Sequence, residues 1–86
     1  MSVGEAKARL QQGVESAGVA RTIIEGIATD TGDAARLAQT TLYDSEHPEA
    51  TRALACLKSA TDELDLVVRR IDISVEAADE YRETLG

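Results

Sequence analysis

The chain is poor in the residues that usually fill a compact core: its 86 residues include no tryptophan, no phenylalanine and only two tyrosines. The core must therefore come from isoleucine, leucine, valine and many alanines, which make it thin but let helices approach closely. A single cysteine, Cys56, cannot form an intramolecular disulfide, so the sequence does not support a disulfide-stabilised exported scaffold. A chain of this length buries only roughly 60% of its unfolded surface, so we expect marginal stability that a partner would raise.

Long apolar runs are also missing. No stretch approaches the length of a membrane span, and the amino terminus lacks the charged, apolar and cleavage segments of a secretory signal. We therefore expect a cytoplasmic protein that does not bind membranes, with export by a route that needs no cleaved signal as the alternative.

Basic side chains are outnumbered. The formal net charge is −7, which argues against binding to nucleic-acid phosphates or to an anionic membrane. Residues 1–43 carry five acidic and four basic side chains, whereas residues 44–86 carry eleven and five. The second half is thus the acidic one, and a basic partner would suit it.

The chain does contain a regular apolar repeat. In each half, apolar or small residues alternate in steps of three and four, which places them along one narrow side of a helix. In the first half these inner positions are Val3, Ala6, Leu10, Gly13, Ala17, Ala20, Ile24, Ile27, Thr31, Ala34, Ala38 and Thr41. In the second half they are Ala50, Ala53, Leu57, Ala60, Leu64, Val67, Ile71, Ser74, Ala78, Tyr81 and Leu85. The pattern predicts an all-α fold, an antiparallel two-helix hairpin with coiled-coil-like packing.

The expected boundaries follow from capping residues. Ser2 and Glu5 have the spacing of a capping box, and Pro48 suits the first position of a helix. We predict a single domain over residues 1–86, with a helix over 3–43, a bend over 44–47 and a helix over 48–84. Gly13, Gly18, Gly26 and Gly32 lie in the interior of the first helix, so a three-helix bundle with a break near residues 29–32 is the alternative.

Further apolar residues lie off the inner positions, and a lone hairpin does not need them. We therefore predict a homodimer, giving a four-helix bundle, or binding to another helical protein. The expected partner-binding residues are Ile23, Leu54, Val68 and Val75. The alternative is that these residues widen the interface inside one hairpin.

No pattern of residues predicts catalysis or a cofactor. The only histidine, His47, lies at the bend with too few ligands around it for a metal site, and Cys56 has no neighbour placed to activate it. We expect neither an enzyme nor a bound metal or cofactor.

Acidic residues recur on the second helix at steps of three and four. They are Asp62, Asp65, Asp72, Glu76 and Asp79, and Glu83 extends the series. We interpret this acidic face as a solvated surface, with docking of a basic partner as the alternative. Arg69 and Arg70 are expected to form ion pairs with acids of the same helix.

The layout resembles the W-x-G family of bacterial type VII secretion, small acidic helical hairpins that are often dimeric and lack a cleavable signal. Two signatures of that family are absent. Residues 44–48 stand where the Trp-x-Gly bend would be, and Tyr81 is followed four residues later by Leu85 and not by an acid. The resemblance implies a partner-binding hairpin associated with secretion or effectors, and it assigns no site residue.

Our leading functional hypothesis is a non-enzymatic adaptor, escort or scaffold subunit that binds itself or a helical partner. The alternative is an acidic regulatory or inhibitory protein, of the antitoxin, immunity or nucleic-acid-mimic type, that occupies a basic site.

Overall fold

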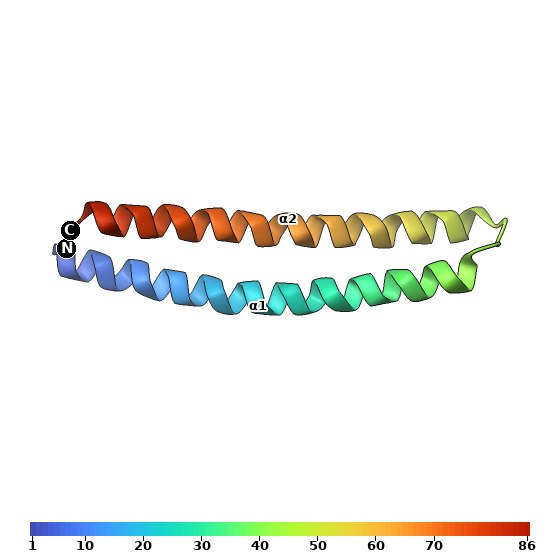
Figure 1. Cartoon of the computed structure of the whole chain (residues 1–86), viewed down its shortest axis with the longest axis horizontal. Helices are drawn as coiled ribbons and strands as arrows, with labels where there is room; N and C mark the ends of the chain where they lie inside the picture. Colours follow the sequence, from blue (N-terminus) through green and yellow to red (C-terminus); the bar gives the residue numbers. More distant parts are fainter.

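The computed structural model describes residues 1–86 as two antiparallel helices, α1 (Val3–Leu42) and α2 (Pro48–Thr84), joined by a short bend (Figure 1). The two chain termini lie together at the end opposite the bend (Figure 1). The molecule is a rod of 63 × 16 × 15 Å. The predicted all-α helical hairpin is confirmed.

Local interactions explain where the helices begin. The Ser2 hydroxyl accepts a hydrogen bond from the Glu5 amide at 3.1 Å, which satisfies one free donor of the first turn of α1. His47 has extended backbone geometry before α2 and provides no side-chain cap. Pro48 then occupies the first turn, where the amide it lacks has no partner in any helix.

Helix α1 is continuous through residues 29–32, so the alternative of a three-helix bundle is wrong. The glycines do not mark a break. They are not needed for close packing within the hairpin either, since a Cβ atom built on Gly13, Gly18 or Gly26 would meet nothing within 4 Å.

The inner side of each helix differs from the expected one by a rotation of about one residue. Several expected inner residues are exposed: Gly13, Ile27, Ala34, Thr41, Ala53, Ser74 and Tyr81. The residue after each of them is half-buried: Val14, Ala28, Ala35, Leu42, Leu54, Val75 and Arg82. Val68 is also half-buried, next to the half-buried Val67. At Gly13, Thr41 and Ser74 the exchange places valine or leucine between the helices, which removes apolar area from water, whereas at Ile27 it places alanine there and exposes the isoleucine.

Very little of the chain is fully buried. Ala50, with 8% of its surface exposed, is the one buried residue of the 86. The hairpin exposes 6353 Å², whereas a compact protein of 9.2 kDa exposes about 4,900 Å². The excess of about 1,400 Å² arises because two helices form one interface and enclose no centre.

Candidate functional site: two unlike faces of the hairpin

The rotation of the helices gives the rod two long faces of different character. The first, called the Ile27 face, is formed at seven-residue spacing by Ala6, Gly13, Ala20, Ile27, Ala34 and Thr41 of α1 and by Ala53, Ala60, Val67, Ser74 and Tyr81 of α2. The opposite side, called the Arg21 face, consists of Gln11, Gly18, Arg21, Glu25, Gly32 and Gln39 of α1 and of Lys58, Asp65, Asp72, Asp79 and Arg82 of α2. One face is thus apolar and the other polar.

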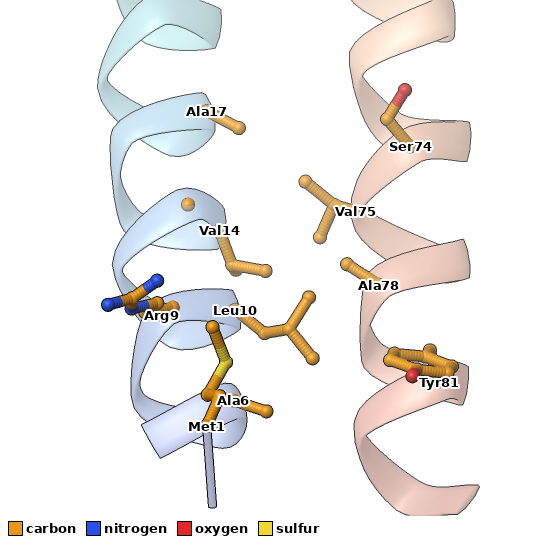
Figure 2. A pocket seen from close by; sticks show the side chains of 11 residues that line it. Met1, Ala6, Arg9, Leu10, Val14, Ala17, Ser74, Val75, Ala78 and Tyr81 are labelled. Atoms are coloured by element: carbon orange, nitrogen blue, oxygen red, sulfur yellow. The ribbon is translucent and has the colours of Figure 1, made fainter.

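The Ile27 face is hollowed near the chain termini. A groove of about 480 Å³ lies there, and its lining includes Gly13 of α1 and Ser74 and Tyr81 of α2. Figure 2 shows that Leu10 and Val14 of α1 point toward Val75 of α2 beside this groove. The groove is apolar because small and aliphatic side chains line it on both helices.

Two large aliphatic side chains lie exposed at the middle of the rod on this side. Ile27 is 48% exposed, and Ile23, one turn earlier, is 58% exposed. Tyr81, which is 56% exposed, adds apolar surface to the Ile27 face closer to the chain termini. Exposed apolar side chains that gather on one face are typical of a surface that contacts another protein.

The Arg21 face is held by ion pairs between the helices. The Arg21 guanidinium donates to Asp72 from Nε at 2.6 Å and from Nη2 at 3.1 Å, and it also pairs with Glu25. This bidentate contact is the reason that the pKa of Asp72 lies below its ordinary value near 3.8. Both side chains remain partly exposed, so the contact fixes the register of the helices more than it stabilises the fold.

A second polar contact lies closer to the chain termini. Arg82 of α2 donates to Gln11 of α1 and forms an ion pair with Asp79 at 3.1 Å. Together with the Arg21 contacts, it sets which residues of the two helices lie level with one another. Polar contacts between α1 and α2 are thus concentrated on the Arg21 face.

The predicted partner-binding residues lie in two different environments. Leu54, Val68 and Val75 are half-buried on the side of α2 that packs against α1. This placement agrees with the alternative interpretation, in which they widen the interface inside one hairpin. Ile23 alone among the four is exposed. Large apolar side chains are also exposed away from the Ile27 face, at Val19, Leu66 and Ile73, so Ile23 and Ile27 form part of the apolar surface left for a partner.

The acidic residues of α2 do not form one uninterrupted stripe. Asp72 and Asp79 are engaged in ion pairs on the Arg21 face, whereas Asp62, Asp65 and Glu76 are exposed. The expectation for Arg69 and Arg70 is wrong, since neither forms an ion pair within the chain. Arg70 instead lies exposed beside the Ile27 face.

Cys56 and the candidate metal ligands are not brought together into a reactive or metal-binding site. Cys56 is an exposed free thiol, and no group of three or more histidine, cysteine or acidic side chains is placed to hold a metal ion. Neither helix has an apolar stretch of the length and purity that crossing a membrane demands.

Comparison with models of known protein families, with curated proteins and with solved structures finds no match to this chain.

The sequence pattern did not single out the Ile27 face. The seven-residue repeat predicts that Ile27 and Tyr81 lie between the two helices, and both are exposed. A signal in the sequence is that two adjacent residues in a heptad can each occupy the inner position, as with Gly13 and Val14 or Ser74 and Val75. In these two pairs the bulkier residue faces the other helix and the smaller one is left on the outside, whereas Ile27 is exposed beside the half-buried Ala28 and follows no such rule.

Proposed function

We propose that this chain is a non-enzymatic protein–protein interaction module, an adaptor, escort or scaffold subunit that binds a helical surface through its Ile27 face. The observation that carries the proposal is that a chain in which only Ala50 is buried leaves Ile27 48% exposed on its apolar face, with Ile23, 58% exposed, one turn away. Burying aliphatic side chains against a second surface lowers the free energy, because it removes apolar area from water. An amphipathic helix of a partner presents an apolar stripe that can supply this surface.

The polar groups support binding over catalysis. Carboxylates act as general acids or bases when a cleft desolvates them, and the acids of this chain lie at the surface of a rod. Asp72 and Asp79 are also engaged by arginines of the same chain, which leaves fewer acids for docking into a basic site. A cytoplasmic role, or one in a set of secretion- or effector-associated proteins, is consistent with the resemblance in layout to the W-x-G hairpins.

Site-specific photo-crosslinking in living cells tests this proposal. A photo-reactive amino acid in place of Ile27 should yield a crosslinked product of one discrete mass. The matched control is Val19, which is 63% exposed on the outward side of α1 and belongs to neither face. Equal yields from both positions, or no product from either, would contradict a binding role for the Ile27 face.

The same experiment separates apolar from acidic docking. Asp65→Asn combined with Glu76→Gln removes two exposed charges of α2 and should leave the crosslink at Ile27 unchanged. Loss of the product in this variant would favour an acidic surface that occupies a basic site.

A further inference from the structure

We propose that the occupant of the Ile27 face is a second copy of this chain, packed as a four-helix bundle in which the two bends lie at opposite ends. This inference rests on the proposed function and names its partner. It follows from the area left uncovered, from the order of residues along the face and from the charges beside it.

The uncovered area suits a stable dimer. Each hairpin exposes about 1,400 Å² more than a compact protein of its mass. If two copies buried this excess surface against each other, the interface would bury about 2,800 Å² in total. This area lies in the range found for the interfaces of permanent homodimers. An interface of this size must run along the length of the 63 Å rod, and of its two long faces the Ile27 face is the apolar one.

The Ile27 face is ordered so that it fits its own copy. Ile27 and Val67 lie nearly level at the middle of the rod, as the contacts of Arg21 with Asp72 and of Arg82 with Gln11 fix the register. A two-fold axis across the rod at this level packs α1 on α1 and α2 on α2 of the second copy.

This axis exchanges residues that lie one or two heptads on either side of the centre. It places Tyr81 opposite Ala53 of the second copy and Gly13 opposite Thr41 of the second copy. A large side chain thus meets a small one near each end of the rod, while Ile27 and Val67 pack on their own copies at the centre.

Charges beside the face decide between the two ways in which the rods can stack. Glu63 and Arg70 lie about one turn on either side of Val67, are exposed, and have no ion-pair partner within the chain. With the bends at opposite ends, Glu63 of each copy faces Arg70 of the other, which gives two symmetric ion pairs. With the bends at the same end, Glu63 faces Asp30 of the second copy, and two pairs of like charges oppose each other.

Light scattering coupled to size-exclusion chromatography tests the association. The native chain should have twice the 9.2 kDa mass of one copy. Ile27→Glu should raise the dissociation constant of the dimer by at least about 100-fold, because the two-fold symmetry places one charged side chain from each copy in the apolar interface. Val19→Glu, which changes a more exposed aliphatic residue outside the face, should leave the mass unchanged.

Loss of helix in Ile27→Glu but not in Val19→Glu would also support the dimer, since a marginal hairpin then depends on its partner for folding. A native chain that is helical and has the mass of one copy at hundreds of micromolar would overturn it. If such a monomer still gives a discrete crosslink from Ile27 with another protein, the dimer fails and the proposed function stands.

Charge reversal tests the orientation. Glu63→Arg and Arg70→Glu should each weaken the dimer about tenfold, and the double variant should restore it because the pairs re-form with reversed sign. If Glu63→Arg tightens the dimer, the bends lie at the same end, since the new arginine would then face Asp30.

A disulfide provides an independent readout of the same geometry. With the bends at opposite ends, Cys56 faces Ala77 of the second copy, so Ala77→Cys should give a dimer linked by disulfides on oxidation. The two positions are about 30 Å apart within one helix and cannot bond inside one chain. Failure to crosslink while the dimer persists in solution would overturn the proposed orientation.

Discussion

Replacing the outward glycines of α1 by alanine should stabilise the hairpin. Gly18 and Gly26 lie in the interior of a continuous helix, and a Cβ atom at either position would meet nothing within 4 Å. Alanine restricts the unfolded chain and favours helix by about 1 kcal/mol relative to glycine in a helix interior. The two sites are two turns apart and share no contact, so the double variant should gain about 2 kcal/mol.

Urea unfolding followed by circular dichroism is the direct measurement. The transition midpoint should rise while its slope stays the same, because the surface exposed on unfolding hardly changes. In thermal unfolding, a gain of about 1 kcal/mol corresponds to a rise of roughly 4–8 °C for a domain of this size. All variants must be compared at one protein concentration, since association adds to the apparent stability.

Gly13→Ala is the matched control because Gly13 also has open space around its Cβ position but belongs to the Ile27 face. At concentrations where the chain is monomeric, it should gain as much as Gly18→Ala. At concentrations where the dimer forms, the added methyl group enters the interface and the gain should shrink. If neither Gly18→Ala nor Gly26→Ala raises the midpoint, the reasoning fails, since α1 would then not be a regular helix at those positions.

Three further predictions concern the hairpin itself. Ile24→Ala should destabilise it by about 2 kcal/mol, because Ile24 is half-buried between the helices, and chemical unfolding would detect the change. Since the pKa of Asp72 is lowered by Arg21, its contribution is present above the unfolded pKa and is lost as the pH falls through the folded one. As the pH is lowered below about 4, the urea concentration at the unfolding midpoint should therefore decrease, and it should decrease by less in Asp72→Asn. An identical decrease in both proteins would refute the linkage. Ser2→Ala should cost about 1 kcal/mol and speed amide exchange at Glu5, while unchanged exchange there would show that the cap does not form in solution.

The class of fold was decided by the sequence alone. A seven-residue repeat in both halves, Ser2 before the first repeat and Pro48 before the second are local signals, and each acts on the backbone within one or two turns. They suffice for two helices and a reversal of the chain, because helix formation and capping depend on near neighbours. The glycines within α1 were ambiguous in the sequence, since their cost of about 1 kcal/mol each does not by itself end a helix.

Only the tertiary structure decided which side of each helix faces the other. Adjacent positions such as Gly13 and Val14, or Ser74 and Val75, fit a repeat of seven equally well, and a rotation of one residue exchanges them. The choice depends on the area that both helices bury together, which is a property of the pair and not of either segment. That rotation turned Leu54, Val68 and Val75 inward, left Ile27 and Tyr81 outside, and thereby created the apolar face on which the proposed function rests.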